Sequence, residues 1–348
     1  MKIVIVTDAW EPQVNGVVRT LKQTCQCLEA LGHDVFLITP QDFKTIPCPT
    51  YPTIPLSLFP GRKVKKLLSS YNANAVHIAT EGPLGMAARR WCLRNNVRFT
   101  TSYHTQFPEY LRLRAPIPVS WTYAWLRRFH GKAVRTLVPT RSQQQCLFDR
   151  QFKGVEVWGR GVDTRVFTPD EPKELNLPGP ILLNVGRVAV EKNIEAFLKL
   201  DVPGSKVIVG DGPDLPALKQ RYPDVTFTGA KFGKELASHI AAADVFVFPS
   251  KTDTFGLVLL EAMACGVPVA AYPVTGPVDV VQDGITGCLN IDLAQAVLAA
   301  QQLEPKACLS YAQENSWMAA TEVFASYMYD NRDKKPKDAI TNHAFWCL

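Results

Sequence analysis

Short runs of consecutive apolar residues alternate along the chain with stretches in which apolar residues recur every three or four positions. Strands buried on both faces of a parallel sheet read as continuous apolar runs, and helices that cover such a sheet show the longer period. The alternation therefore predicts an α/β fold with doubly wound parallel sheets. The predicted strands of the first half span residues 2–7, 34–39, 75–78, 98–102, 136–139 and 154–158.

A second series of the same kind follows a turn-rich stretch at residues 159–169. A chain of 348 residues exceeds the size at which a single core is common. We therefore expect two Rossmann-like domains, at residues 1–168 and 169–324. The predicted strands of the second domain span residues 181–185, 206–209, 224–228, 245–249 and 267–271.

Composition narrows the class of protein. Hydrophobic residues make up 47% of the chain and charged residues 20%, which is ordinary for a soluble globular protein. No apolar run approaches the roughly 18 residues needed to cross a bilayer, and the first residues lack the apolar core of a signal peptide. The nine cysteines are odd in number, scattered and without a CxxC pair, which favours reduced thiols over a disulfide framework or a zinc site. These features predict a cytoplasmic protein.

The net charge of +6 is unevenly distributed. Residues 1–170 hold 23 Lys and Arg against 11 Asp and Glu, and the remainder holds 15 against 21. In the first half the cations are interleaved with Trp, Tyr and Leu, which suits the surface of an anionic membrane. A solvated basic face is the alternative, whereas nucleic acid is disfavoured because no known nucleic-acid motif occurs and the other half is acidic. The candidate membrane and acceptor residues are Arg62, Lys63, Lys65, Lys66, Tyr110, Arg112, Trp121 and Trp125.

Two candidate ligand-binding segments follow predicted strands of the first domain. Gly16 and Val17 lie in the turn after the first strand, where open α/β sheets bind ligands and where the next helix would present its amino end. The segment has no GxGxxG, which disfavours a dinucleotide dehydrogenase. His104 follows the strand at residues 98–102, beside Thr and Tyr hydroxyls. Its position at a strand end admits a catalytic as well as a structural role.

Two cations follow the first strand of the second domain. Arg187 and Lys192 lie five residues apart over a turn and a predicted helix start. Cations are poorly placed at the amino end of a helix unless an anion binds there, so the pair favours a diphosphate site over a solvated surface pair. Gly210, in a Gly-Asp-Gly turn that closes the next strand, is a weaker candidate because such turns are common.

An acidic pair with a glycine between its members lies at residues 250–268. Asp253 falls in a turn, and Glu261 follows eight positions later on a predicted helix. One carboxylate can therefore face a ligand from the loop and the other from the helix, beside the helix amino end with its unpaired N–H groups. The arrangement suits a ligand with both hydroxyls and phosphates, that is, a nucleotide sugar. An acidic first turn on an ordinary buried helix is the alternative.

Together, the segments around Arg187, Gly210 and Asp253 resemble the retaining glycosyltransferases of the GT-B fold, family 4. The resemblance implies two Rossmann-like domains whose parallel sheets face each other across a cleft. It also implies that a last helix, at residues 325–348, packs back on the first domain. In this family the acid at the position of Asp253 is usually Glu, which is one methylene longer.

The resemblance also implies a role for each candidate residue. Gly16 and Val17 line the cleft near the donor phosphates or sugar, with Arg19 assisting; Gly210 forms part of the nucleotide pocket wall, and Glu261 accepts hydrogen bonds from the ribose. The residues expected to hold the sugar or its phosphates are Asp253, Thr254, Phe255, Gly256 and Leu257. The residues expected to act in catalysis are His104, Arg187, Lys192 and Asp253, with the two cations gripping the diphosphate.

The expected activity is retaining transfer of a hexose or hexuronic acid from a nucleotide-diphosphate sugar, by family analogy a UDP-sugar. The resemblance is nearest to lipid-glycosylating members, the glycosyl-diacylglycerol synthases and phosphatidylinositol mannosyltransferases. It implies a membrane lipid acceptor such as diacylglycerol, a peripheral place on the inner face of the cell membrane, and no metal or other cofactor. The alternatives are a soluble sugar or oligosaccharide acceptor, a GDP-mannose donor, and, in another class, a non-catalytic nucleotide-sugar-binding protein.

Overall fold

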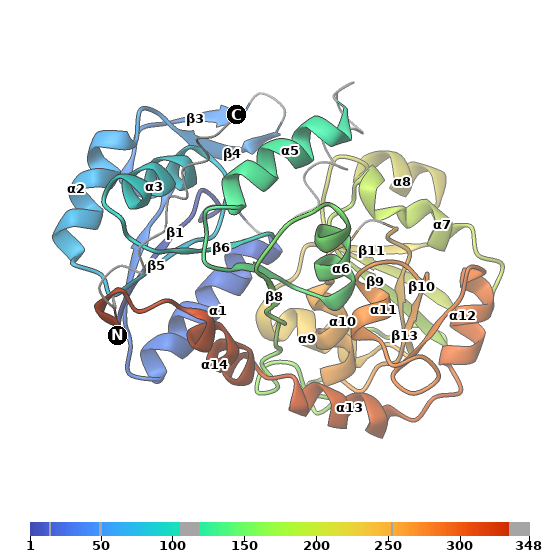
Figure 1. Cartoon of the computed structure of the whole chain (residues 1–348). Coiled ribbons are helices and arrows are strands. Elements are labelled where there is room, and N and C mark those ends of the chain that lie inside the picture. The colour runs from blue at the N-terminus through green and yellow to red at the C-terminus, as the bar shows by residue number, and fades with distance from the viewer. Residues whose placement is uncertain (14, 49–50, 105–117, 252, 334–348) are drawn as a thin grey trace, which may run out of the picture.

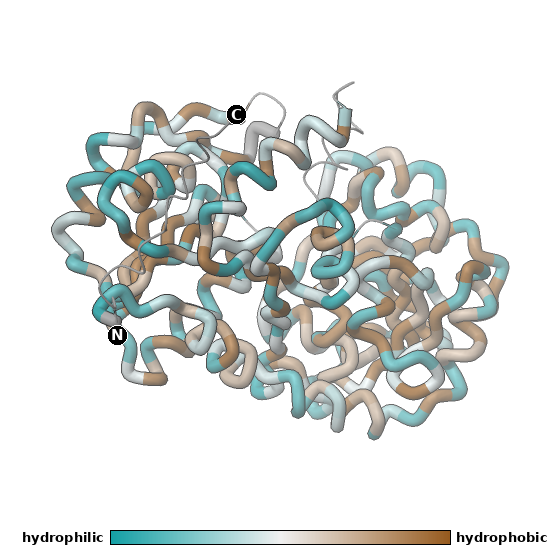
Figure 2. The backbone as a smooth tube through the Cα atoms, in the orientation of Figure 1, coloured by the Kyte–Doolittle hydropathy of each residue, from teal (hydrophilic) through white to brown (hydrophobic). Residues whose placement is uncertain are grey.

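The computed structural model describes residues 1–13, 15–48, 51–104, 118–251 and 253–333. Figure 1 shows two lobes side by side, each a sheet flanked by helices. The hydrophobic positions concentrate along the central strands of both lobes, and hydrophilic positions lie mainly on outer loops and helices (Figure 2). The predicted α/β class with two parallel sheets is confirmed.

The sheet of the first lobe has six strands in the order β2-β1-β5-β6-β7-β8, all parallel. Each of these strands was predicted from an apolar run, although all except β5 are one or two residues shorter than predicted. The strands are β1 (Lys2–Val6), β2 (Asp34–Ile38), β5 (Ala75–Ile78), β6 (Thr100–Ser102), β7 (Thr136–Val138) and β8 (Val155–Val157).

Helices cover both faces of this sheet. Ile3 and Ile5 belong to one core cluster, and Val4 and Val6 belong to another, because successive side chains of a strand point to opposite faces. All four are completely buried, which explains why β1 reads as a continuous apolar run. The helices of the lobe are α1 (Gly16–Ala30), α2 (Gly61–Tyr71), α3 (Pro83–Arg94), α5 (Val119–His130) and α6 (Arg141–Asp149), with the 3₁₀ turn η1 (Pro40–Asp42).

The sheet of the second lobe repeats this plan, with six parallel strands in the order β11-β10-β9-β12-β13-β14. Its strands are β9 (Ile181–Val185), β10 (Ser205–Val209), β11 (Thr226–Gly229), β12 (Val245–Phe248), β13 (Val269–Ala271) and β14 (Gly287–Leu289). Its helices are α7 (Ile194–Leu198), α8 (Leu215–Arg221), α9 (Gly233–Ala241), α10 (Leu257–Ala264), α11 (Pro277–Val280), α12 (Leu293–Ala300) and α13 (Pro305–Glu314), with the 3₁₀ turn η2 (Val190–Lys192).

Three strands were not predicted. β3 (Thr45–Cys48) and β4 (Tyr51–Ser57) form a separate antiparallel hairpin rich in proline, which usually argues against a strand. Neither belongs to a six-stranded sheet, so its prolines remove no hydrogen bond from the core. β14 has three residues and pairs with β13 at the edge of the second sheet. Its Gly-Cys-Leu sequence is only partly buried and does not form a continuous run of large apolar residues.

The chain returns to the first lobe through α14 (Trp317–Tyr327), which packs against α1 and is followed by η3 (Asn331–Asp333). Phe324 and Met328 join the core cluster of Ile3 and Ile5. The return therefore begins at Trp317, earlier than the expected residue 325, and the segment 334–348 lies outside the described residues. A Cβ at Gly161 would lie 2.2 Å from the backbone nitrogen of Trp317, so the two chain crossings between the lobes pass in direct contact.

Candidate functional site

The amino ends of α1 and α10 face each other between the lobes. Asn15 caps α1 by accepting a hydrogen bond from the Val18 N–H at 3.0 Å, so the helix begins at Gly16. A Cβ at Gly16 would lie 3.7 Å from Cδ1 of Leu257, the first residue of α10. Two predicted ligand-binding positions, 241 residues apart in the numbering, are thus brought together. Both helices direct their partly positive ends to this gap.

The turn that precedes α10 contacts the first lobe. Gly256 takes a left-handed conformation with φ of 80°, which glycine adopts without strain and which ends the loop sharply. The Thr254 hydroxyl donates a hydrogen bond to the carbonyl oxygen of His104 at 3.0 Å. The structure therefore joins Thr254 and His104, two residues that the sequence placed in one site. The intervening Phe255 is half-buried against the core of the second lobe.

Glu261 lies in the second turn of α10 and is almost completely buried. Its Oε1 accepts an ion-paired hydrogen bond from Nη2 of Arg19, which belongs to α1 of the opposite lobe. Its Oε2 is buried and has no hydrogen-bond partner among the described residues. Burial raises the pKa of Glu261, and the charge of Arg19 and its hydrogen bond oppose that rise. Arg19 of the first lobe is thus in direct contact with the Glu261 carboxylate of the second lobe.

Lys192 and Asp253 form the second ion pair of the cleft, and both belong to the second lobe. Lys192 ends η2, which follows β9, and Asp253 follows β12, the strand next to β9 in the sheet. Asn193 ties these two loops together, because its side-chain amide donates to the carbonyl oxygen of Pro249 at 3.0 Å. The predicted cation and carboxylate thus meet at the carboxyl edge of one sheet.

Arg187 and Gly210 lie at the same edge. Arg187 is exposed two residues beyond β9. Gly210 follows β10 with φ of 154°, and a Cβ there would lie 1.8 Å from the carbonyl oxygen of Gly186. Only glycine fits this contact, so Gly210 allows the ends of β9 and β10 to approach each other beside Arg187. Packing against Gly186 is therefore sufficient to explain why a glycine occupies position 210.

His104 is held by a residue that the sequence reasoning did not single out. Nη2 of Arg160 lies 3.2 Å from Nδ1 of His104, and Arg160 itself is anchored by its Nη1, which donates to the carbonyl oxygen of Trp158 at 2.6 Å. A guanidinium can only donate, so Nδ1 accepts and the proton of the neutral imidazole resides on Nε2. Burial, followed by the charge of Arg160, lowers the pKa of His104 well below its ordinary value. His104 is therefore a neutral hydrogen-bond donor through Nε2, a buried atom without a partner among the described residues.

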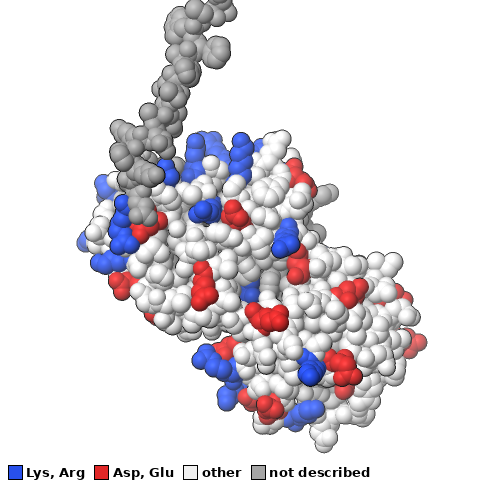
Figure 3. Space-filling model, turned by 60° about the horizontal axis from the view of Figure 1, so that its bottom comes forward, with Lys and Arg blue, Asp and Glu red and all other residues white. Residues whose placement is uncertain are grey.

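The candidate acceptor residues lie on two helices of the first lobe. Arg62, Lys63, Lys65 and Lys66 are all exposed on α2, and Trp121 and Trp125 are exposed on α5, with 72% of Trp121 accessible. Figure 1 places α2 at the outer side of the first lobe and α5 on the side toward the second lobe. In the view of Figure 3, Lys and Arg gather along the upper left of the molecule. Tyr110 and Arg112 lie outside the described residues.

An exposed hydrophobic residue adjoins the basic helix. Phe59, two residues before α2, is 95% exposed and has a left-handed φ of 46°. Nothing in the sequence singled out Phe59 beyond its position in a proline-rich turn.

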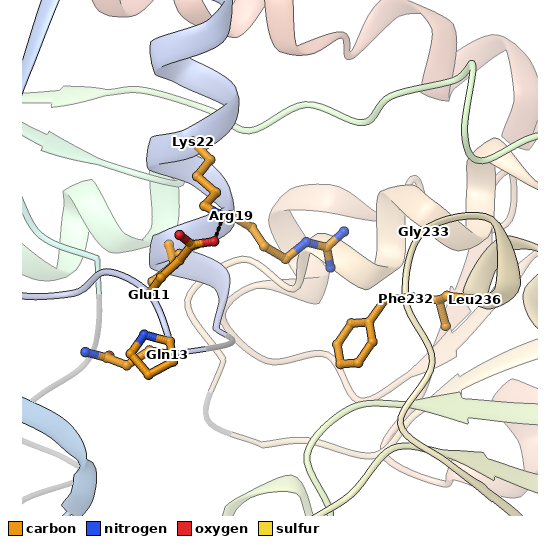
Figure 4. Close-up of a pocket in the computed structure, with 9 residues that line it drawn as sticks. Glu11, Gln13, Arg19, Lys22, Phe232, Gly233 and Leu236 are labelled. Carbon is orange, nitrogen blue, oxygen red and sulfur yellow. Dashed lines mark hydrogen bonds and ion pairs between the residues drawn. The ribbon is translucent and has the colours of Figure 1, made fainter. Parts of the chain in front are cut away.

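A cavity of about 520 Å³ lies between the lobes next to Arg19. One wall comes from the segment before α1 and its first turns, with Glu11, Gln13 and Arg19, and the other comes from the start of α9, with Phe232 and Leu236. Figure 4 shows the Arg19 side chain extending from α1 toward the second lobe, while Lys22 turns to Glu11 within its own lobe. The volume suits a small-molecule site, since ligand pockets begin at about 300 Å³.

Metal-binding clusters and membrane-spanning helices are both absent from the described residues. No group of three or more His, Cys, Asp or Glu there is arranged to hold a metal ion. Within the same part of the chain, no helix is both long enough and apolar enough to cross a membrane.

Two protein-family models match the chain. The model described as Glycosyltransferase Family 4 matches residues 14–166, and that described as Glycosyl transferases group 1 matches residues 179–303. A GDP-mannose-dependent alpha-mannosyltransferase of Mycobacterium tuberculosis is 32% identical over 316 residues, which cover 83% of this chain and 83% of the relative. An alpha-monoglucosyldiacylglycerol synthase of Streptococcus pneumoniae is 28% identical over 375 residues, covering 95% of this chain and 85% of the relative.

Solved structures share the fold. A sucrose-phosphate synthase from Thermosynechococcus elongatus superposes with a TM-score of 0.73 at 23% identity, covering 93% of this chain and 97% of that one. HepE of Anabaena in complex with UDP-glucose gives a TM-score of 0.68 at 14% identity, covering 94% and 98%. The two parallel-sheet lobes, the match to the family model and the identity with the mannosyltransferase lead to one conclusion. The chain belongs to the family 4 glycosyltransferases of the GT-B fold.

Proposed function

We propose that the protein transfers a hexose from a nucleotide-diphosphate sugar to a membrane lipid, with retention of the anomeric configuration. The observations that carry the donor side are the ion pair of Lys192 with Asp253, in the loop that leads into α10, and the buried Glu261 of α10, which Arg19 reaches from α1 of the other lobe. Cations and helix amino ends bind phosphate oxygens, and carboxylates accept hydrogen bonds from sugar hydroxyls.

In the proposed donor complex, Lys192 and Arg187 hold the diphosphate, and Glu261 binds the ribose through its unpartnered Oε2. Asp253 binds a hydroxyl of the transferred sugar. Lys192 already touches Asp253, so the sugar and the diphosphate meet at one pair of side chains. This supports a site in which the scissile bond lies beside the pair.

In the proposed reaction, the bond between the anomeric carbon and the diphosphate oxygen breaks as the acceptor hydroxyl attacks from the same face. The electron pair leaves on the diphosphate, and a diphosphate oxygen takes the proton of the attacking hydroxyl. Arg187 and Lys192 stabilise the charge that grows on the leaving group. His104 donates its Nε2 proton in a hydrogen bond to a hydroxyl of the sugar, and closure of the lobes excludes water that would hydrolyse the donor. No step needs a bound metal, so we expect transfer in the presence of EDTA.

Two observations support a lipid acceptor. The exposed cations of α2 adjoin Phe59, and basic side chains beside an exposed aromatic ring bind anionic interfaces. The Streptococcus pneumoniae relative is named for diacylglycerol. We therefore propose a peripheral protein that meets its acceptor at the membrane surface through the first lobe.

For the donor, similarity favours GDP-mannose as the first candidate and a UDP-hexose, expected from the sequence, as the second. The mannosyltransferase is 32% identical over most of both chains, whereas the UDP-glucose complex of HepE is 14% identical. Either donor presents the same diphosphate and ribose to Lys192 and Glu261.

The test is transfer by purified protein from GDP-mannose, UDP-glucose or UDP-glucuronic acid to vesicles that contain diacylglycerol and phosphatidylinositol. We expect one donor to yield a glycolipid by mass spectrometry, with the donor's anomeric configuration by NMR. Lys192→Ala should strongly reduce the amount of product. Lys199→Ala, which removes an exposed cation that pairs with Glu195 of α7, should leave it unchanged. Transfer only to soluble sugars would establish the alternative acceptor. Nucleotide binding without transfer from any donor would establish the non-catalytic class.

A further inference from the structure

Arg19 connects the two lobes at the most deeply buried acid of the cleft. Its guanidinium pairs with Oε1 of Glu261, whose side chain is 5% exposed, while the Arg19 side chain is 42% exposed. The Arg19 backbone belongs to α1 of the first lobe, and Glu261 belongs to α10 of the second. The contact therefore forms only when the lobes lie as they do here.

A carboxylate in this place requires help to stay ionised. Burial favours the neutral form of Glu261 and raises its pKa, and among the described residues Arg19 is the source of the opposing charge. Cys265, the residue that follows α10, has its pKa raised to about 12, by burial first and then by Glu261 and Glu171. The helices packed against α10 carry further titratable groups, none of which forms a hydrogen bond or ion pair with Glu261: Lys234, Glu235 and His239 of α9, Asp279 of α11, and Lys306, Cys308, Tyr311 and Glu314 of α13.

The two oxygens of this carboxylate have different surroundings. Oε1 is engaged by Arg19, and Oε2 is buried with no partner among the described residues. A buried acceptor without a partner is costly, so its retention calls for a donor that arrives with a ligand. Arg19 also lines the cavity of about 520 Å³ between the lobes, which brings the ion pair to the edge of a space able to hold a nucleoside.

We propose that Arg19 is a positioning residue for the donor: from the opposite lobe it holds Glu261 ionised and in place, so that Oε2 accepts the ribose hydroxyl. This inference rests on the proposed function, in which Glu261 binds the ribose. It gives Arg19 a task other than contact with the donor phosphates. It also makes tight nucleotide binding depend on both lobes, although Lys192, Asp253 and Glu261 all come from the second.

The test is the affinity for GDP and for UDP, measured by isothermal titration calorimetry with Arg19→Met at about pH 8 and about pH 6. Without Arg19, the pKa of Glu261 moves further up, so a larger fraction is protonated at the lower pH. We expect the dissociation constant of the tighter nucleotide to rise about tenfold at pH 8, the scale of one charge-assisted hydrogen bond, and further at pH 6. Arg19→Lys should recover part of the affinity because it restores the charge.

The matched control is Arg221→Met, which removes the exposed partner of Glu195 from α8 and should bind as the wild type does at both pH values. A loss in Arg19→Met that does not grow at low pH would overturn the inference, because a phosphate contact or a merely structural tie between the lobes predicts that result. Unchanged affinity would overturn it as well. Failure of the wild-type chain to bind either nucleotide would overturn the proposed function and this inference with it, which separates the two failures. Circular dichroism confirms that each variant is folded.

Discussion

The two lobes contribute to the cleft in different ways. The second lobe brings together Lys192 and Asp253 on adjacent strands of one sheet, so their pairing needs nothing from the first lobe. The first lobe contributes Arg19, which reaches across to Glu261 of the second lobe, and His104, which is held in place by Arg160 of its own lobe. In our proposal, the second lobe therefore supplies the wall that binds the donor, and Arg19 of the first lobe completes it through Glu261.

The largest expected effect is at Lys192. Lys192→Ala removes the cation that pairs with Asp253 and, in our proposal, stabilises the leaving diphosphate. We expect kcat to fall on the order of 10²–10³-fold, as for loss of one preorganised donor in a transition state. Steady-state kinetics with the accepted donor measures it, and Lys199→Ala serves as the control. A loss of affinity with unchanged kcat would limit Lys192 to ground-state binding.

Gly210→Ala tests whether the donor wall depends on the close approach of β9 and β10. The new Cβ would collide with the carbonyl oxygen of Gly186, at a φ that alanine rarely adopts. We expect the second lobe to lose about 3 kcal/mol of stability from strain and overpacking. Urea unfolding followed by circular dichroism measures the loss. Gly61→Ala, where a Cβ meets nothing within 4 Å, should unfold as the wild type does.

Arg160→Leu tests the support of His104 in the first lobe. Without the guanidinium, Nδ1 of His104 loses its donor and the imidazole is no longer confined to the tautomer with its proton on Nε2. We expect the pKa of His104 to rise, because Arg160 lowers it, and kcat to fall about tenfold. ¹⁵N NMR of the ring nitrogens reports the tautomer and the titration. An unchanged Nε2–H tautomer in the variant would show that Arg160 does not set it.

The smallest expected effect comes from Asp253→Glu, which introduces the acid that the family usually has. The side chain gains one methylene, and its contact with Lys192 and with the sugar must readjust. We expect nucleotide affinity to stay within about twofold, and the preference among hexoses to change by up to about tenfold, the scale of one hydrogen bond. Competition between donors measures the preference. A large loss of nucleotide affinity would place Asp253 at the diphosphate instead.

Much of the fold was predictable because its signals are local. Completely buried residues such as Val4 and Ile5 make β1 readable from a few positions, and the buried central strands β5, β9 and β12 follow the same rule. The hairpin β3–β4 was missed because its prolines disguise it.

By itself the sequence determined the two parallel sheets and the family, and it predicted Lys192, Asp253 and Glu261 as donor-site residues, since short windows carry periodicity and motif spacing. Only the tertiary structure decided that Arg19 pairs with Glu261, that Arg160 holds His104, and that the chain returns to the first lobe at Trp317. Arg19 and Glu261 are 242 positions apart, and Arg160 and His104 are 56 positions apart. The return at Trp317 brings together the two chain crossings between the lobes. Contacts between residues so far apart in the sequence depend on how the two sheets pack against each other, which no local pattern specifies.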